Sequence, residues 1–188
     1  SPTGVEISEL YDSMSQYPTH ISSPEYKKYI TQQRDADAKE SDYKWSAGDT
    51  IRTAIGQSYN NYTSALMSKY VATLANGGTR YSMHFLNKIT NNDGKTEEEY
   101  QPKVESKIEI KKENLDAIFK GMFLVTTGPR GTLRNYFKDF PVDVAAKSGT
   151  AQQSSKRSEH TTFVAFAPLE DPQISVCVII PFGNGTTG

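Results

Sequence analysis

Hydrophobic residues recur at intervals of three and four along two segments of the chain, which is the spacing of an amphipathic helix. The first helix is predicted to begin at Thr63, a good N-cap, and to end at Gly77-Gly78. Glycine suits this end because it tolerates the left-handed conformation that follows a helix. The side chains expected on the buried face of this helix are Leu66, Met67, Tyr70, Val71 and Leu74.

The second helix is predicted over residues 113–127 and ends at the break in residues 128–131, Gly-Pro-Arg-Gly. Its buried face is expected to comprise Leu115, Ile118, Phe119, Met122 and Phe123. Ser23 followed by Pro24 has the pattern of an N-cap and a first helical residue, which predicts a shorter helix near the start. Residues 84–110 are predicted to form a hairpin whose turn is Asn-Asn-Asp-Gly, residues 91–94.

Three extended segments follow, at residues 142–152, 161–167 and 174–180. Their connections are short and turn-like, so we predict an antiparallel sheet in which the first strand pairs with the second and the second lies beside the third. The third segment is almost continuously apolar, which predicts a central strand buried on both faces. Helices followed by consecutive antiparallel strands indicate an α+β fold, an antiparallel sheet with helices packed on it.

Composition narrows the class of protein. The chain of 188 residues corresponds to one domain or a large part of one. Only 36% of its residues are hydrophobic, and it contains no run of about 18 apolar residues, as a membrane-spanning helix requires. The formal net charge is −1, with both signs interspersed, so no strong positive field is available to attract nucleic acid. A single cysteine, Cys177, excludes an intramolecular disulfide and any multi-cysteine zinc site.

The segment Lys147-Ser148-Gly149-Thr150, called the lysine box below, carries the most informative chemistry. It combines a fixed positive charge, two short hydroxyl donors and a glycine, and the alanines before it leave room for another backbone to approach. This combination suits an extended, peptide-like ligand that ends in a carboxylate. Alternation along a strand sends Lys147 to one face and Ser148 and Thr150 to the other, so the ligand must lie along the edge of the strand. The alternative is an ordinary polar surface strand.

Other patterns are weaker. Residues 183–188 match G-x-G-x-x-G, but the helix and second parallel strand of a dinucleotide site do not follow. His20, His84 and His160 have no metal-ligand spacing, and no cofactor or metal is expected. His160 lies close after the lysine box, and we expect it to make a structural hydrogen bond at the start of a strand.

The lysine box resembles the third signature motif of penicillin-binding proteins and serine β-lactamases. Further segments resemble, in the same order, those of class B penicillin-binding proteins of the elongation type. One is the G-D…I-G-Q pattern of residues 48–57, and another is the helix that ends A-T-L-A-N-G-G at residue 78. The others are the helix and glycine turn of residues 115–132 and the H-T-T-F-V-A-F-A-P strand of residues 160–168. The resemblance extends from about residue 3 to residue 188.

This resemblance implies a D,D-transpeptidase that cross-links peptidoglycan stem peptides through an acyl-serine intermediate in cell-wall synthesis. By motif position, Lys147 is the catalytic residue and maintains the electrostatics around the reacting serine. Ser148, Gly149 and Thr150 form the substrate-binding part, in which the two hydroxyls bind a carboxylate and the Thr150 N–H is an oxyanion donor. The implied partners are stem peptides, β-lactam antibiotics and other cell-wall synthesis proteins. The implied location is the extracytoplasmic face of the bacterial membrane, with an anchor outside this chain.

Two motifs of the family are missing, since an S-x-x-K nucleophile box and an S-x-N box should precede the lysine box. The S-x-x-K of residues 41–44 lies in a charged stretch, and the S-x-N of residues 58–60 follows Ile-Gly-Gln, where the family has glycine. We interpret both as coincidences. Residues 3–7 resemble the T-G-I-E-L that follows the true S-x-N box.

We therefore interpret residues 1–188 as the C-terminal part of a single penicillin-binding transpeptidase domain, an incomplete fold that is inactive alone. Both missing boxes would lie upstream of residue 1. The alternatives are a β-lactam sensor domain and a degenerate, non-catalytic interaction domain of the same fold.

Overall fold

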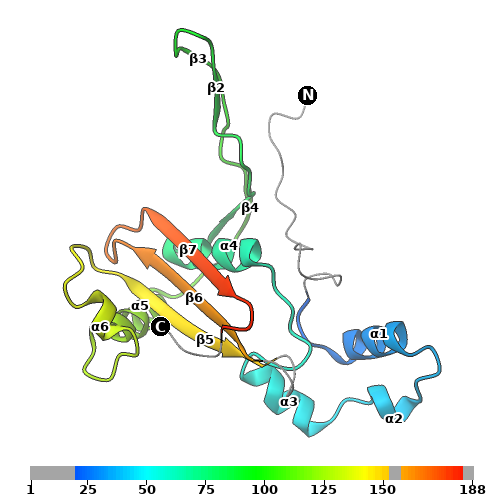
Figure 1. The fold of residues 1–188 in the computed structure, drawn as a ribbon. Helices are drawn as coiled ribbons and strands as arrows, with labels where there is room; N and C mark the ends of the chain where they lie inside the picture. Colours follow the sequence, from blue (N-terminus) through cyan, green and yellow to red (C-terminus); the bar gives the residue numbers. More distant parts are fainter. Residues whose placement is uncertain (1–19, 153–157, 184–188) are drawn as a thin grey trace. The chain divides into compact units, whose positions relative to one another are not determined.

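The computed structural model describes residues 20–152 and 158–183 (Figure 1). Two compact units are present: a smaller one within residues 9–63, and a larger one that contains all residues from Ser64 onward.

The smaller unit contains α1 (Pro24–Arg34), α2 (Glu40–Tyr43) and α3 (Ala47–Ala54). The predicted start of α1 is confirmed, because the Ser23 hydroxyl accepts a hydrogen bond from the backbone N–H of Tyr26 at 3.1 Å. A bridge between His20 and Asn61 joins the two ends of the described part of this unit.

In the larger unit, the first predicted helix is α4 (Ser64–Ala75), and its glycine end is confirmed. The N–H of Gly77 donates to the Leu74 carbonyl and that of Gly78 to the Thr73 carbonyl, the hydrogen-bond pattern of a Schellman motif. Gly77 has φ +81°, as this motif requires. The buried face differs from the prediction, because Lys69 and Thr73, which were not expected on it, are buried. Tyr70 is 55% exposed, and the fully buried residue of the stripe is Val71.

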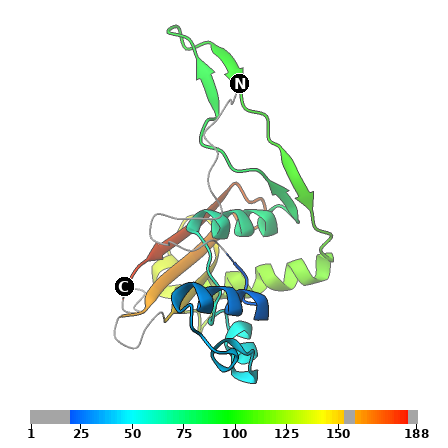
Figure 2. The ribbon, with the colours of Figure 1, turned by 90° about the vertical axis from the view of Figure 1, so that its right-hand side faces the viewer.

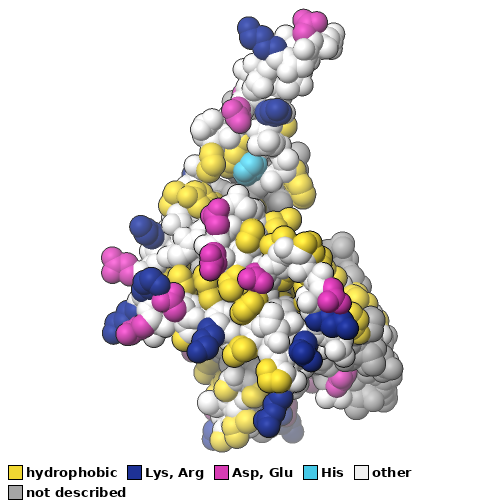
Figure 3. All heavy atoms as spheres, turned by 90° about the vertical axis from the view of Figure 1, so that its left-hand side faces the viewer, with side chains coloured by type: hydrophobic (Ala, Val, Ile, Leu, Met, Phe, Trp, Pro, Cys, Tyr) yellow, Lys and Arg dark blue, Asp and Glu magenta, His cyan; other side chains and the backbone are white. Residues whose placement is uncertain are grey.

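The predicted hairpin forms a two-stranded antiparallel ribbon, drawn in green in Figure 1. Its strands are β2 (Lys88–Thr90) and β3 (Thr96–Glu99), and below them β1 (Thr79–Tyr81) pairs with β4 (Val104–Lys107). The turn is confirmed, since Gly94 has φ +78° and donates to the Asn91 carbonyl. In Figure 3, hydrophobic side chains gather near the base of this ribbon, with acidic and basic side chains interspersed. The most exposed apolar residues of this segment are Phe85, Val104 and Ile108.

The second predicted helix is α5 (Lys112–Thr127), followed by a short helix, α6 (Arg134–Phe137), that was not predicted. Phe119 and Met122 pack into the core as expected, whereas Ile118 is 40% exposed. None of the helices in the described ranges is long and apolar enough to cross a bilayer.

The three predicted strands are β5 (Ala145–Ala151), β6 (His160–Ala167) and β7 (Ile174–Ile180). They form an antiparallel sheet in the order β5-β6-β7, so the predicted pairing is confirmed. The prediction that residues 174–180 form the central buried strand is wrong, because β6 is central and β7 has an exposed apolar stripe. The residues of this stripe are Ile174, Val176, Val178 and Ile180. Continuous apolarity correctly predicts two apolar faces, but it does not specify the order of the strands.

The core has two parts, one on each face of the sheet. On one face, α4 and α5 pack over Ala145 and Phe166, and Figure 2 shows both helices on the same side of the strands. On the other face, Leu133 packs with Val144, Ala146 and Ala165. The strand that contains the lysine box is therefore held from both faces at its first residues.

Candidate functional site

The lysine box lies in the middle of β5, an outer strand of the three-stranded sheet. Among the described residues, β5 has a strand partner on one side only, β6. The register pairs Lys147 with Val164, Ser148 with Phe163 and Thr150 with Thr161. The side chains therefore alternate as predicted, with Ser148 and Thr150 on the face of Ala146 and Lys147 on the face of Ala145.

Lys147 is exposed, and its ammonium donates a hydrogen bond to the backbone carbonyl of Ser148, the next residue of the same strand. The long side chain thus folds back along β5. In this position the positive charge lies beside the strand that also carries the two hydroxyls. That a ligand along this edge meets both sets of groups stays a prediction.

Gly149 is closely approached by the neighbouring strand, whereas the predicted approach of a ligand backbone stays untested. A Cβ at this position would lie 2.5 Å from the Oγ1 atom of Thr162, its partner on β6. The close approach is therefore made by a side chain of the neighbouring strand. The alanines before the box also have a packing role, since both are completely buried. Ala145 lies beneath α4 and α5, and Ala146 lies on the other face, against Leu133 and α6.

The glycine turn between α5 and α6 lies directly against the end of α5. A Cβ on Gly128 would lie 2.6 Å from the Leu124 carbonyl oxygen, and one on Gly131 would lie 2.5 Å from that of Val125. The next residue, Thr132, brings its Oγ1 atom to 3.3 Å from Oγ of Ser148. A second link joins α5 to the site strand, because the buried Thr126 hydroxyl donates to the Val144 carbonyl at 2.7 Å.

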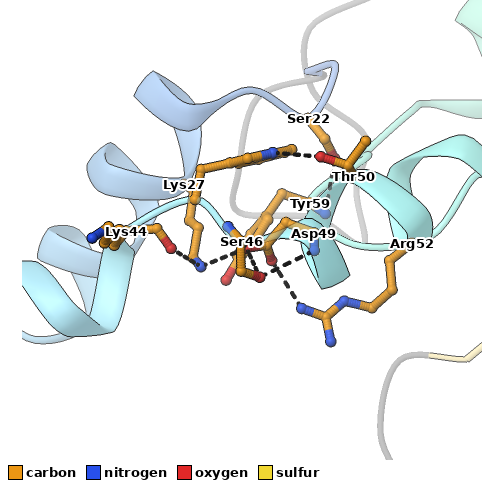
Figure 4. Close-up of polar contacts among 9 residues, drawn as sticks. Ser22, Lys27, Lys44, Ser46, Asp49, Thr50, Arg52 and Tyr59 are labelled. Atoms are coloured by element: carbon orange, nitrogen blue, oxygen red, sulfur yellow. Dashed lines mark hydrogen bonds and ion pairs between the residues drawn. The ribbon is translucent and has the colours of Figure 1, made fainter.

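A charged cluster in the smaller unit surrounds Asp49, whose side chain is completely buried (Figure 4). Its carboxylate accepts from the Lys27 ammonium at 2.9 Å and from the Arg52 guanidinium at 2.8 Å. The backbone N–H and hydroxyl of Ser46 also donate to it, and the Asp49 N–H donates back to the Ser46 hydroxyl, which forms a capping box at the start of α3. The Ser46 hydroxyl and then the Lys27 ammonium hold the pKa of this carboxyl well below its usual range.

The two serines that match family motifs by spacing have other environments. Ser41 lies on the exposed helix α2, and its hydroxyl donates to Asp42 at 3.3 Å. Ser58 has φ +71°, and its buried hydroxyl has no hydrogen-bond partner. Asn60, the third residue of the S-x-N match, accepts from the Ser22 N–H and the Tyr62 hydroxyl and donates to the Gln57 carbonyl.

The histidines and the cysteine have local roles. Nδ1 of His160 accepts a hydrogen bond from the N–H of Phe182 at 3.3 Å, which confirms the predicted structural bond at the start of β6. His84 stacks on Tyr100, in the segment that leads to the hairpin. Burial raises the pKa of the Cys177 thiol, so the thiol stays protonated. Within residues 20–152 and 158–183, no three His, Cys, Asp or Glu side chains come together as metal ligands.

Two residues with well-defined contacts were missed in the sequence. Asp49 is one, although the Ser46-x-x-Asp49 spacing is a recognisable capping-box signal. Thr132 is the other, and no local pattern indicates that it meets a residue 16 positions further along the chain. Residues 3–7 and 184–188 lie outside the described part, so the predictions for them stay untested.

Comparisons with known proteins agree with this arrangement. A family model described as the penicillin binding protein transpeptidase domain matches residues 25–188. Peptidoglycan D,D-transpeptidase MrdA of Escherichia coli (strain K12) is 34% identical over 154 residues, which cover 74% of this chain and 24% of MrdA. Penicillin-binding protein 2B of Streptococcus pneumoniae (strain R6) is 31% identical over 154 residues, 77% of this chain and 22% of that protein.

Among solved structures, Pseudomonas aeruginosa PBP2 in complex with WCK 5153 matches with a TM-score of 0.66 and 30% identity. The match covers 94% of this chain and 37% of that chain. The present chain therefore spans about a quarter of the length of the two curated relatives.

Proposed function

The chain belongs to the penicillin-binding protein transpeptidase family, and from this we propose that it supplies the substrate-binding strand of a peptidoglycan D,D-transpeptidase. The observation that carries the proposal is the placement of the lysine box on an outer strand, with the Lys147 ammonium folded along that strand. The names of the relatives mention penicillin and peptidoglycan, which supports two proposed ligand classes: β-lactam antibiotics and the stem peptides of peptidoglycan.

In the proposed reaction, a serine attacks the penultimate D-alanine carbonyl of a stem peptide, forms an acyl-enzyme and expels the terminal D-alanine. An amine of a second stem peptide then attacks the ester and frees the serine. Lys147 supplies positive charge near the serine, and the hydroxyls of Ser148 and Thr150 bind the terminal carboxylate of the substrate. The N–H of Thr150 donates to the oxyanion of the tetrahedral intermediate, where such a bond contributes about 3 kcal/mol.

The nucleophile is proposed to lie outside this chain, in a segment that precedes it in the intact protein. The surroundings of Ser41 and Ser58 support this view. The Ser41 hydroxyl donates to the neighbouring Asp42 and not to the lysine of its S-x-x-K match, and the Ser58 hydroxyl has no hydrogen-bond partner that could activate it. The 188 residues are then the C-terminal part of one transpeptidase domain and are inactive alone. In the intact protein, the domain would work outside the cytoplasmic membrane, with its anchor and its contacts to other cell-wall proteins in other segments.

The test is covalent labelling of the full-length protein by a fluorescent penicillin. We expect Lys147→Ala to lower the labelling rate by roughly a hundredfold or more, the effect of removing electrostatic stabilisation from such a site. Thr150→Val should lower it by about tenfold to a hundredfold, because it removes a hydrogen bond to a charged group worth about 1.5–3 kcal/mol. Lys95→Ala, in the exposed hairpin turn, is the matched control and should label like the wild type.

The 188-residue chain alone should show no covalent label by mass spectrometry. Stoichiometric labelling of the isolated chain at Ser41 or Ser58 would contradict the proposed domain boundary. Unchanged labelling rates in both lysine-box variants of the full-length protein would contradict the site assignment.

A further inference from the structure

Thr132 is held in place by the residues on either side of it. Gly131 lies so close to the Leu124 and Val125 carbonyl oxygens that no side chain fits there. Leu133 is 5% exposed, packs against the sheet, and donates its N–H to the Val125 carbonyl at 3.1 Å. The backbone of Thr132 is therefore fixed on both sides, while its own side chain is exposed.

The face that Leu133 covers is also the face of Ser148. Leu133 packs with Ala146 and Ala165, and Ala146 lies two residues before Ser148 on the same side of β5. From this fixed turn, Oγ1 of Thr132 reaches Oγ of Ser148 at 3.3 Å. Two hydroxyls from separate elements thus meet beside the lysine box.

The chemistry of two hydroxyls gives this contact a direction once an anion binds. A serine hydroxyl has one proton, and an ionised carboxylate can only accept. If Ser148 donates its proton to a carboxylate, its oxygen can only accept from Thr132. The result is two consecutive hydrogen bonds, in which Thr132 donates to Ser148 and Ser148 donates to the anion. Each of these hydrogen bonds polarises the other.

We propose that Thr132 is a positioning residue, which fixes the rotamer of the Ser148 hydroxyl and directs its proton to the carboxylate of the ligand. This inference rests on the proposed function, because it assumes that Ser148 binds that carboxylate. Thr132 itself contacts neither the ligand nor the reacting atoms. The family resemblance and the sequence motifs assign it no such role.

The experiment measures the rate of acylation of the full-length protein by benzylpenicillin, which carries a carboxylate, and by its neutral methyl ester. Thr132→Val should lower the rate with benzylpenicillin roughly threefold to tenfold, the effect of one neutral hydrogen bond. The rate with the methyl ester should change less than twofold. Thr132→Ser keeps the hydroxyl and should restore the wild-type rate with benzylpenicillin. Because Thr132 is exposed, neither substitution should affect folding.

Ser148→Ala tests whether Thr132 acts through Ser148. It should slow acylation by benzylpenicillin, and Thr132→Val added to it should cause no further loss. Equal losses with both penicillins, or an undiminished effect of Thr132→Val beside Ser148→Ala, would overturn the positioning role alone. If Ser148→Ala does not change the rate, both this inference and the proposed role of Ser148 fail.

Discussion

Asp49 in the smaller unit and Lys147 in the larger unit are both charged residues of motifs that resemble the same family, but their surroundings are opposite. Asp49 is completely buried and both carboxylate oxygens are engaged by Lys27, Arg52 and Ser46. Lys147 is exposed, and its ammonium donates to a backbone carbonyl of its own strand. A buried charge whose partners all come from the protein is engaged within the fold, and removal of one partner leaves another charge buried and uncompensated. An exposed ammonium that donates to a single carbonyl has further N–H donors with which it can bind a ligand.

Removal of the Asp49 carboxylate should have the largest effect on stability. Asp49→Ala leaves the Lys27 ammonium buried without its anion, and breaking a buried ion pair in this way costs about 3–5 kcal/mol. Denaturation of the chain by urea measures the loss. Asp37→Ala, on an exposed loop, is the control and should change the free energy of unfolding only slightly. Equal stability of the two variants would mean that the cluster is not what holds α1 and α3 together.

The same cluster predicts a loss of stability in acid. The pKa of Asp49 is lowered in the folded chain, so its contribution is fully present above the unfolded value of about 3.9. The contribution then decreases as the pH falls through the lower folded pKa, because the folded state resists protonation of this group. Urea unfolding between about pH 2 and pH 6 measures it. Asp49→Ala should show a smaller loss over this range than the wild type, whereas parallel curves would contradict the prediction.

Packing around the lysine box should respond to steric change, since little space separates Gly149 from the Thr162 side chain. Gly149→Ala places a methyl group 2.5 Å from Oγ1 of Thr162, and overpacking of this kind costs about 1–3 kcal/mol. The other Thr162 atom near this position, Cβ, is 3.8 Å away. Thr162→Ala should therefore restore most of the stability in the double variant, measured by thermal unfolding. No restoration would show that Gly149 is required by the backbone and not by Thr162.

The sequence predicted those parts of the fold that depend on neighbouring residues. The cap at Ser23, the glycine end at Gly77 and the turn at Gly94 are local signals, and each is confirmed. Tyr70 and the position of β7 were predicted wrongly, because exposure and strand order depend on which elements pack together. An apolar strand such as β7 is compatible with either the centre or the edge of a sheet.

The candidate site was predictable to the same extent. The alternation of Lys147 and Ser148 about β5 follows from the period of a strand, and the register confirms it. The contact between Thr132 and Ser148 was not predictable, because it joins two elements through the packing of Leu133. The contact between Gly149 and Thr162 likewise depends on the register of two strands.

The smallest effect is predicted for Ser58 in the smaller unit, a position where the sequence departs from the family pattern. Ser58 has φ +71°, a left-handed conformation that costs a residue with a side chain about 1–2 kcal/mol and that glycine adopts freely. Its buried hydroxyl also has no hydrogen-bond partner. Ser58→Gly, which restores the residue expected after Ile-Gly-Gln, should therefore raise the free energy of unfolding by about 1 kcal/mol in urea denaturation.

Ser41→Gly is the matched control, because Ser41 lies in α2 and glycine destabilises a helix. Opposite signs for the two substitutions would attribute the gain to backbone conformation, whereas a loss of stability in Ser58→Gly would mean that the serine side chain has a role in this turn.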